Sequence, residues 1–362
     1  MQNPFNNFLS SRSNSYLAVD IGTTSIKAME LKAGKRAPLV TNYGILESSG
    51  YLARANQALQ TSSLKIFEAD VIELLKTLTK QMGTHTRQAV ASLPPFSAFM
   101  TVLDFPKMDP KEIQTAMIYQ ARQYVPLPLD EVALDWIVVG DYQDEKGFEH
   151  QKIMLISVPQ EQIQKYQRMF KGAGLELKAL EIESLALART MSDDPTPTLV
   201  IDMGSRSTNI VFMEDGHFTF SGQSDFGGAS LTQVLATSLS INPIRAEELK
   251  KDRGIAGTGP NYELSTIMLP LLDAILNEVK KVQFLYQQQL PYARKIERVV
   301  LAGGSANLLG IEKYFERELG MPVVKAAPFV KFEHPIEMEP FIPELNPVMS
   351  VALGLGMKEF TS

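Results

Sequence analysis

The stretch YLAVDIGTTSIKAME (residues 16–30) has a near copy, TLVIDMGSRSTNIVF (residues 198–212), just past the middle of the chain. Each copy reads as an apolar strand that ends in Asp, one further residue and Gly, followed by small polar residues and a second alternating strand. Alignment of the copies places Asp20 on Asp202 and keeps the following glycines in register. Because the copies are separated by about half the chain, the sequence predicts an internally duplicated α/β fold.

The composition is that of a globular protein with a large core. The chain has 362 residues, of which 44% are hydrophobic. Its net charge of -6, from 35 Lys and Arg against 41 Asp and Glu, argues against a nucleic-acid partner. Cys is absent, which excludes disulfides and thiolate metal sites. Since no uninterrupted apolar run approaches the roughly 18 residues that span a bilayer, we expect a cytoplasmic protein without direct membrane insertion.

The order of predicted elements gives the domain organisation. The first hairpin precedes a third alternating stretch, a helix with apolar residues at 71, 74, 75 and 78 that ends at Gly83, and a short strand, QAVASLP. This order, β-β-β-α-β, predicts a sheet with a helix on one face. The predicted division is a flexible N-terminus at 1–14, a first half at 15–97 and 176–197, an inserted α+β subdomain at 98–175, and a second half at 198–362.

The predicted insertion contains a clearly marked helix. Asp109 is suited to its N-cap, Pro110 to its first turn and Glu112 to the third position of a capping box. Two long strands, LDWIVVGDY and QKIMLISVP, follow on either side of a charged turn. The later segments are predicted as a helix at NPIRAEELKKDRG, a long helix around 269–289 and a final apolar helix at 346–360.

The two hairpin turns are candidate phosphate sites. A turn of small residues can direct backbone N–H groups and hydroxyls at phosphate oxygens, and the Asp that ends the strand can hold a Mg²⁺-bound water. Gly22 and Gly204 would let the backbone approach closely. A single such turn could equally be a tight turn on a buried strand. Two copies in facing halves would clamp a polyphosphate between them.

Two further segments are suited to the rest of a nucleotide. In VVLAGGSANLLG, a buried strand runs into Gly303, Gly304 and Ser305 before a helix, so bare backbone and a helix N-terminus could meet a flat ring or a phosphate. In AEELK, Glu247 and Lys250 lie on one helix face and could hold two ribose hydroxyls. The alternatives are a packing turn and a solvated surface pair.

Together these motifs resemble the actin-like ATPase superfamily, which includes actin, sugar kinases, MreB and FtsA. The resemblance implies two ribonuclease H-like halves, ATP or ADP with Mg²⁺, and at most slow ATP hydrolysis. It implies metal contacts by Asp20 and Asp202, and catalytic roles for Asp202 and for Glu183, which would orient water. It implies nucleotide contacts by Asp20, Gly22, Thr23, Thr24, Lys27, Gly204, Ser205, Gly227, Gly228, Glu247, Lys250, Gly303, Gly304 and Ser305.

Within this superfamily, the insertion resembles that of FtsA. The amino-acid sequence at residues 103–140, 172–189 and 351–359 is similar to that of the PilM family of type IV pilus proteins. This resemblance implies a scaffold of the inner-membrane assembly platform that binds the N-terminal cytoplasmic segment of PilN. The protein would then be peripheral at the inner membrane through this and other pilus components. Self-association stays open.

Two other functions remain as alternatives: an FtsA-like filament-forming, membrane-associated ATPase and a small-molecule kinase of the same fold. Hydrolysis is less well supported than binding, because Lys27 of the first hairpin is matched by Asn209 in the second. For the partner surface, ARQYVPLPLDE offers Tyr124, Val125 and Leu127 to an extended peptide. The alternative is that this apolar segment packs under the strand that follows it.

Overall fold

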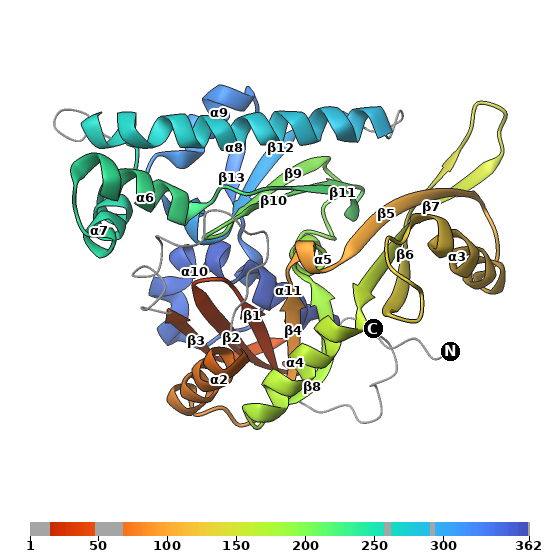
Figure 1. The fold of residues 1–362 in the computed structure, drawn as a ribbon, viewed down its shortest axis with the longest axis horizontal. Coiled ribbons are helices and arrows are strands. Elements are labelled where there is room, and N and C mark those ends of the chain that lie inside the picture. Colours follow the sequence, from red (N-terminus) through yellow and green to blue (C-terminus); the bar gives the residue numbers. More distant parts are fainter. Residues whose placement is uncertain (1–14, 48–67, 257–261, 290–293, 361–362) are drawn as a thin grey trace.

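The two larger sheets of the molecule have the same strand order. The computed structural model describes residues 15–47, 68–256, 262–289 and 294–360 (Figure 1), and the predicted flexible N-terminus at 1–14 lies outside them. The first sheet has the order β3–β2–β1–β4–β8, formed by Leu39–Glu47, Ser25–Lys32, Ser15–Ile21, Gln88–Leu93 and Glu176–Ile182. The second has the order β11–β10–β9–β12–β13, formed by His217–Ser224, Thr208–Glu214, Thr198–Met203, Arg298–Ala302 and Val323–Lys325. The predicted duplication is confirmed.

Strand pairing is also the same in the two halves. The central strands β1 and β9 each pair antiparallel with the next strand in sequence, β2 and β10, to form the hairpins quoted above. On their other edge they pair parallel with β4 and β12. Both central strands are buried along almost their whole length, as expected for strands with neighbours on both edges and packing on both faces.

Helices cover the outer faces of the two sheets and fill the space between them (Figure 1). Near the first sheet lie α2 (Glu68–Met82), which ends before Gly83 as predicted, and α4 (Gln160–Gly172). The long helix α8 crosses the second sheet and begins at Tyr262, earlier than the predicted Leu269. Further helices after the second hairpin include α6 (Gly228–Leu239), α7 (Pro243–Arg253) and α9 (Ile311–Leu319).

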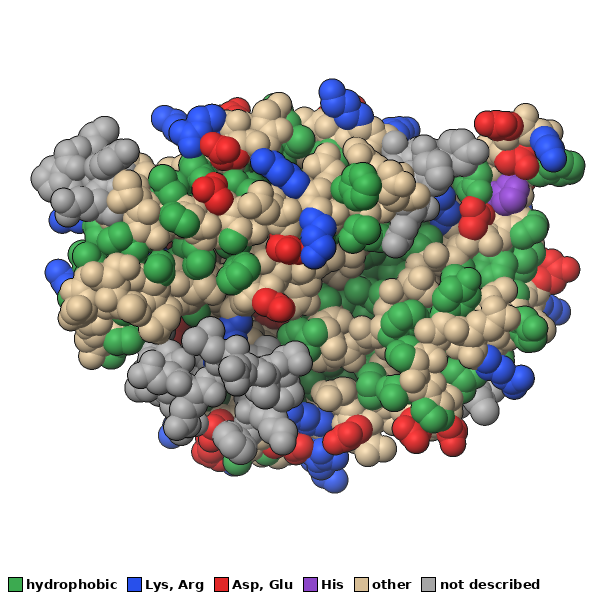
Figure 2. All heavy atoms as spheres, turned by 45° about the horizontal axis from the view of Figure 1, so that its top comes forward, with side chains coloured by type: hydrophobic (Ala, Val, Ile, Leu, Met, Phe, Trp, Pro, Cys, Tyr) green, Lys and Arg blue, Asp and Glu red, His purple; other side chains and the backbone are tan. Residues whose placement is uncertain are grey.

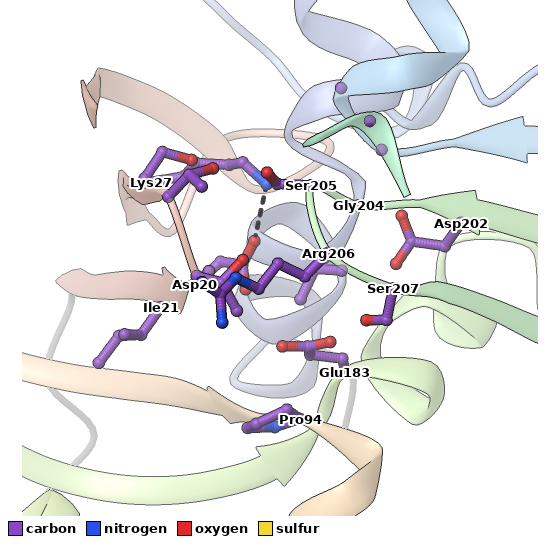
Figure 3. Close-up of a pocket in the computed structure, with 18 of the residues that line it drawn as sticks. Asp20, Ile21, Lys27, Pro94, Glu183, Asp202, Gly204, Ser205, Arg206 and Ser207 are labelled. Atoms are coloured by element: carbon purple, nitrogen blue, oxygen red, sulfur yellow. Dashed lines mark hydrogen bonds and ion pairs between the residues drawn. The ribbon is translucent and has the colours of Figure 1, made fainter. Parts of the chain in front are cut away.

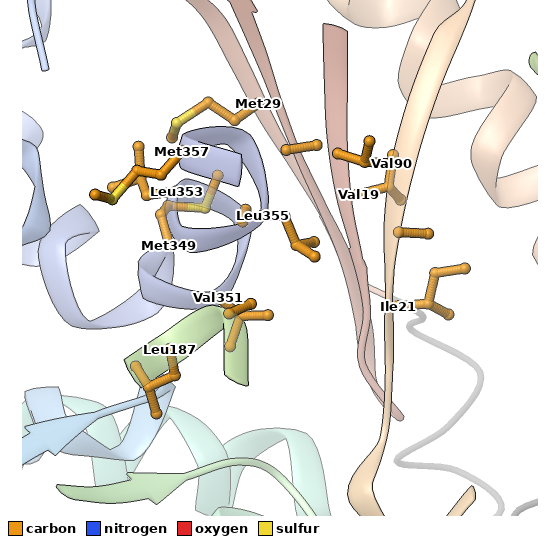
Figure 4. Packing of buried hydrophobic residues seen from close by; sticks show 14 of the residues in the cluster. Val19, Ile21, Met29, Val90, Leu187, Met349, Val351, Leu353, Leu355 and Met357 are labelled. Atoms are coloured by element: carbon orange, nitrogen blue, oxygen red, sulfur yellow. The ribbon is translucent and has the colours of Figure 1, made fainter. Parts of the chain in front are cut away.

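The C-terminal helix α11 (Ser350–Lys358) packs between the halves (Figure 4). Its glycines allow backbones to touch: a Cβ on Gly354 would lie 1.8 Å from the carbonyl oxygen of Ala186 in α5 (Glu183–Arg189). A Cβ on Gly356 would lie 2.1 Å from a methyl carbon of Leu31 in β2. One hydrophobic cluster runs from the first sheet through α11 to the inner face of the second sheet, and the second half also has a separate cluster of its own.

The predicted single helix at 346–360 is wrong. The chain forms two helices, α10 (Ile342–Val348) and α11, which meet at Met349. The backbone of Met349 leaves the helical region there, with φ -99° and ψ 7°. Met349 is fully buried, so the break places one more apolar side chain in the shared core.

The insertion is a three-stranded sheet with one helix on its face. Its order is β5–β7–β6, formed by Phe99–Pro106, Glu149–Pro159 and Val132–Gln143, and the helix is α3 (Pro110–Tyr124). The capping box at the start of α3 is confirmed: Asp109 accepts from the backbone N–H of Lys111 and Glu112, and Glu112 accepts from that of Asp109. Met117 and Ala121 are fully buried against the sheet.

The predicted boundaries of the insertion stay a prediction. The helix α4 falls inside the predicted range 98–175, yet it packs on α2 and β8 of the first half. Arg168 of α4 also pairs with Glu68 of α2 through two hydrogen bonds. None of the helices in the described part of the chain is both long enough and apolar enough to cross a membrane.

Candidate nucleotide site

A cleft of about 1280 Å³ lies between the halves, and it is lined by the turns of both hairpins (Figure 3). Nearly all the predicted site residues line it: Asp20, Gly22, Thr23, Thr24, Lys27, Glu183, Asp202, Gly204, Ser205, Gly228, Glu247, Lys250, Gly303, Gly304 and Ser305. Gly227 is the exception. It packs beneath the second hairpin, where a Cβ would lie 2.7 Å from the carbonyl oxygen of Ser205.

The two hairpin turns have matching geometry. A Cβ on Gly22 would lie 3.0 Å from the carbonyl oxygen of Ser25, and a Cβ on Gly204 would lie 3.0 Å from that of Ser207. Each turn is therefore too tight to accept a side chain at its glycine without a shift of the backbone. Both turns expose bare main chain to the cleft, which is what close approach of a phosphate requires.

Backbone hydrogen bonds from the start of α6 fix the turn of the second hairpin. The backbone N–H of Gly228 donates to the carbonyl oxygen of Gly204 at 2.9 Å, and that of Ala229 donates to the carbonyl oxygen of Ser205 at 2.7 Å. These bonds use N–H groups that a helix N-terminus cannot satisfy internally. The predicted diglycine therefore holds the turn of the second hairpin in place, and Gly228 still reaches the cleft.

In the first hairpin, Asp20 is buried and held by two neighbours. Ser92 of β4 donates to one carboxylate oxygen at 2.8 Å, and Lys27 of β2 donates to the other at 3.1 Å. Burial acts to lower the pKa of Lys27, but the carboxylates of Asp20 and Asp202 outweigh it and raise that pKa above its usual range. Lys27 is therefore a firmly charged cation at the bottom of the cleft.

Asp202 of the second hairpin and Glu183 at the start of α5 are carboxyl groups whose charge is less well compensated. Burial raises the pKa of Asp202 to about 6, and the charge of Asp20 acts in the same direction. Burial also raises the pKa of Glu183 well above its usual range, with further contributions from Asp20 and Asp202. Asn209 donates to Glu183 at 3.3 Å. Such raised pKa values in a cleft are typical of functional sites.

The carboxylates fit a magnesium ion that is held mostly by other ligands. Within the described residues there is no group of three or more His, Cys, Asp or Glu side chains that could hold a metal. Asp20 and Asp202 are two carboxylates only. Mg²⁺ commonly binds through one or two carboxylates together with waters and substrate phosphates, so this pair suits a phosphate-bound Mg²⁺ rather than a metal caged by protein.

The predicted ribose pair has a different arrangement from the one expected. Lys250 is buried and donates to the carbonyl oxygen of Gly228 and to the hydroxyl of Thr232, both at 2.9 Å. It also pairs with Glu247 at 2.7 Å. Since an ammonium has three N–H donors, these contacts engage Lys250 in positioning α6. Glu247 is the better placed of the two to accept a ribose hydroxyl.

The glycine turn after β12 opens onto the cleft. Gly303 has φ +82°, and a Cβ there would lie 2.5 Å from the carbonyl oxygen of Met203. A Cβ on Gly304 would meet nothing within 4 Å, so this residue presents open backbone. The helix that begins at these glycines is a short 3₁₀ helix, Gly304–Asn307, with Gly303 at its N-cap, and the α-helix α9 begins only at Ile311.

A comparison with protein families identifies the chain. The model of the type IV pilus assembly protein PilM matches residues 18–360. The chain belongs to the PilM family. Curated relatives are more distant: two FtsA cell division proteins, from Enterococcus hirae and Enterococcus faecalis, are 26% and 23% identical to it. The first aligns over 47% of this chain and 43% of its own length, and the second over 82% and 74%. The chain thus spans less than half of the Enterococcus hirae relative.

Solved structures have the same fold as this PilM family member. A PilM–PilN type IV pilus biogenesis complex matches with a TM-score of 0.80 at 22% identity, over 97% of this chain and all of that one. EutJ from Carboxydothermus hydrogenoformans matches with 0.56 at 19%, over 96% and 91%. MreB5 of Spiroplasma citri bound to AMPPNP matches with 0.55 at 12%, over 97% of each chain. The predicted actin-like fold is confirmed.

The segment predicted to bind a partner contains both buried and exposed apolar side chains. Val125 is buried in the core of the insertion, as the packing alternative expects, whereas Tyr124 and Leu127 are 47% and 40% exposed. Hydrophobic side chains gather on the right-hand part of the molecule, where the insertion lies (Figure 2). The exposed apolar side chains of the insertion include Ile118, Tyr119, Tyr124, Leu127, Ile137, Val138 and Phe148.

One cleft residue is not identified by the sequence motifs. Arg206, at the tip of the second hairpin, lines the same cleft as the predicted phosphate residues. The signal is present in the alignment of the two copies, which places Arg206 on Thr24. Comparison of Lys27 with Asn209, its equivalent in the second hairpin, does not by itself reveal the cation at Arg206.

Proposed function

We propose that the chain is an ATP·Mg²⁺-binding scaffold of the type IV pilus inner-membrane platform that binds the N-terminal cytoplasmic segment of PilN. The observation that carries the nucleotide part is the pair of matching turns, at Gly22 and Gly204, on one cleft. Membership of the PilM family supports the pilus part. The experiment is ATP-dependent thermal stabilisation of the purified chain, together with binding of a PilN N-terminal peptide.

The residues have distinct proposed roles in nucleotide binding. The turns at 22–25 and 204–207 offer backbone N–H groups and hydroxyls to phosphate oxygens. Lys27 supplies positive charge, and Asp20 and Asp202 hold a phosphate-bound Mg²⁺ directly or through water. The open backbone of Gly304 lies against the nucleoside, and Glu247 accepts a ribose hydroxyl. Mg²⁺ would neutralise charge on the phosphates and on the carboxylates around it.

Turnover is proposed to depend on Glu183. Its side chain lines the cleft from the first residue of α5, and its raised pKa suits a group that accepts a proton from water. Glu183→Gln should bind ATP like wild type but lose the phosphate release that wild type shows. An unchanged release rate in a coupled phosphate assay would remove Glu183 from this role.

Partner binding is proposed for the exposed apolar surface of the insertion. The similar solved structure is that of a PilM–PilN complex, which supports PilN as the partner class. An extended peptide could lay apolar side chains against Tyr124 and Leu127, next to α3 and β6. Binding to a membrane-anchored PilN would bring the chain to the inner face of the inner membrane.

The partner experiment compares two charge substitutions at exposed apolar residues. Leu127→Glu should weaken binding of the PilN peptide at least tenfold, whereas Ile336→Glu in the second half, at a residue that is 79% exposed, should not. ATP affinity should be unchanged in both. Hydrogen exchange should show protection within 99–134 on adding the peptide. Protection confined to the second half or to the nucleotide cleft would place the partner surface elsewhere.

The FtsA-like alternative rests on the two curated relatives, which are cell division proteins. It makes a separate prediction: with ATP, the chain should sediment as polymers at micromolar concentration, and a pull-down from membranes should recover division proteins. Recovery of pilus inner-membrane proteins without ATP-dependent sedimentation would favour the scaffold.

A further inference from the structure

The two hairpins place their cations at different positions. Alignment of the copies puts Lys27 on Asn209 and Thr24 on Arg206. In the first hairpin the cation lies on the strand and the tip is a neutral Thr. In the second the strand residue is neutral and the tip carries Arg. Each of the two aligned stretches, 16–30 and 198–212, therefore has one cation.

The strand position of the second hairpin is not free to bind a phosphate. Asn209 is 6% exposed, and its amide donates to Glu183. Arg206 instead lines the cleft, and its side chain extends across the cleft toward Asp20 of the first hairpin (Figure 3). Partial burial lowers the pKa of Arg206, although a guanidinium remains charged in water.

At the hairpin end of the cleft, carboxyl groups outnumber the cation that lies beside them. Asp20, Glu183 and Asp202 are three carboxyl groups, and Lys27 is the cation beside them. A terminal phosphate placed there would add negative charge to a site that already favours protonation of Asp202. A guanidinium can bind a phosphate through two parallel N–H bonds, which a single ammonium cannot.

The direction of the side chain indicates which phosphate it meets. The proposed nucleoside contacts, Glu247 and Gly304, both belong to the second half. Arg206 leaves that half and reaches toward Asp20, where the two hairpins come together (Figure 3). A phosphate shared by both hairpins is the one farthest from the nucleoside.

We infer that Arg206 binds the terminal phosphate of a nucleoside triphosphate together with Lys27, and so makes the site selective for triphosphate over diphosphate. This inference rests on the proposed nucleotide binding. The juxtaposition that carries it is a guanidinium of one half that lines the shared cleft and points toward Asp20 of the other half (Figure 3).

The test compares affinities for ATP and ADP in the presence of Mg²⁺ by titration calorimetry. In Arg206→Gln, the affinity for ATP should fall about tenfold or more, as for loss of a hydrogen bond to a charged group. The affinity for ADP should change less than about threefold, so the ratio of the two should collapse. Arg206→Lys should be intermediate, since it keeps the charge but not the paired N–H groups. Arg122→Gln, on the exposed face of α3, makes the same charge change far from the cleft and should leave both affinities unchanged.

Three outcomes separate the possibilities. An equal loss for ATP and ADP, or an unchanged ATP affinity in Arg206→Gln, overturns this inference alone. Failure of the wild-type chain to bind either nucleotide overturns the proposed function with it. If Arg206→Gln melts at a lower temperature than wild type, Arg206→Lys carries the comparison, and a wild-type ATP to ADP ratio in that variant counts against the inference.

Discussion

The two hairpins have the same turn but opposite electrostatic surroundings. Around Asp20, Lys27 lies opposite on β2 and Ser92 donates from β4. The equivalent neighbours of Asp202 are Asn209 on β10 and Ala302 on β12. One carboxylate therefore has an ion pair and a hydroxyl, whereas the other has an amide and a methyl group.

This difference explains why burial affects the two aspartates differently, although both are buried. In the first hairpin, Asp20 already has an ion pair with Lys27 and a hydrogen bond from Ser92 without any ligand. The second hairpin holds a carboxyl group whose pKa burial raises to about 6, so its ionised form is poorly stabilised by the protein alone. A ligand that brings positive charge would favour the ionised form of Asp202. We therefore expect a bound cation to change the ionisation of Asp202 in the second half.

The largest expected effect is the loss of nucleotide binding when either turn is filled. Gly204→Val and Gly22→Val both place a Cβ 3.0 Å from a carbonyl oxygen of their own turn, so the backbone must move. Wild type should gain about 4 kcal/mol of stability at ATP about 1,000-fold above Kd, and both variants should lose this gain. Differential scanning fluorimetry with and without ATP·Mg²⁺ measures it.

The same two variants, Gly22→Val and Gly204→Val, also test whether the two turns contribute differently to stability without ATP. Without ATP, Gly204→Val should melt below Gly22→Val, because the carbonyl oxygen of Gly204 accepts from the start of α6. Gly304→Ala is the control: its Cβ would meet nothing, so the free energy of unfolding without ATP should stay near wild type. Wild-type ATP stabilisation in both valine variants would contradict the assignment of the turns.

The second prediction is a pH dependence that comes from Asp202. Its pKa is 3.8 in an ordinary setting and about 6 in the fold, so the folded state binds more protons between these values. The stability of the nucleotide-free protein should therefore be greatest below about pH 4 from this group, and fall by about 3 kcal/mol as pH rises through 6. Urea unfolding in EDTA between pH 4 and 7.5, compared with Asp202→Asn, isolates this contribution. If the free energy of unfolding changes with pH equally in the two proteins, the pKa of Asp202 is not raised by the fold.

The third prediction is a difference in sign between the two aspartates. Asp20→Asn removes the partner of a buried ammonium, Lys27, and should cost about 1–3 kcal/mol in the free energy of unfolding at pH 7.5. Asp202→Asn removes a charge that its surroundings disfavour, so it should be neutral or stabilising without ligand. Both should weaken Mg²⁺-dependent ATP binding. Destabilisation of equal size in the two variants would contradict the difference between the hairpins.

Local sequence patterns predict those parts of the molecule that depend on neighbouring residues. The hairpins, the capping box at Asp109 and the helix end at Gly83 follow from short-range geometry, and all three are confirmed. The predicted nucleotide residues also line the cleft, with Gly227 as the exception, because the repeat puts both turns in register.

The remaining features depend on contacts between distant parts of the chain. Gly354 is required where α11 touches Ala186, and no local period reveals that contact. The engagement of Lys250 by Gly228 is likewise not visible in the sequence, because the two residues lie on different helices. The role of Gly227 under the second turn is of the same kind. Such tertiary contacts decide whether a motif residue binds a ligand or positions its neighbour.

The smallest expected effect tests the hydroxyl that one hairpin has and the other lacks. Ser92 is fully buried and donates to Asp20 at 2.8 Å, so Ser92→Ala should cost about 1 kcal/mol in the free energy of unfolding. Ser184, beside Glu183, is the matched control: it is 1% exposed, and within the described residues its hydroxyl has no hydrogen-bond partner. Ser184→Ala should therefore be neutral or slightly stabilising, because it removes a buried polar group at almost the same volume. Urea unfolding of the two variants in EDTA at pH 7.5 measures the difference. If both lose the same stability, the cost belongs to packing, and the hydroxyl of Ser92 does not distinguish Asp20 from Asp202.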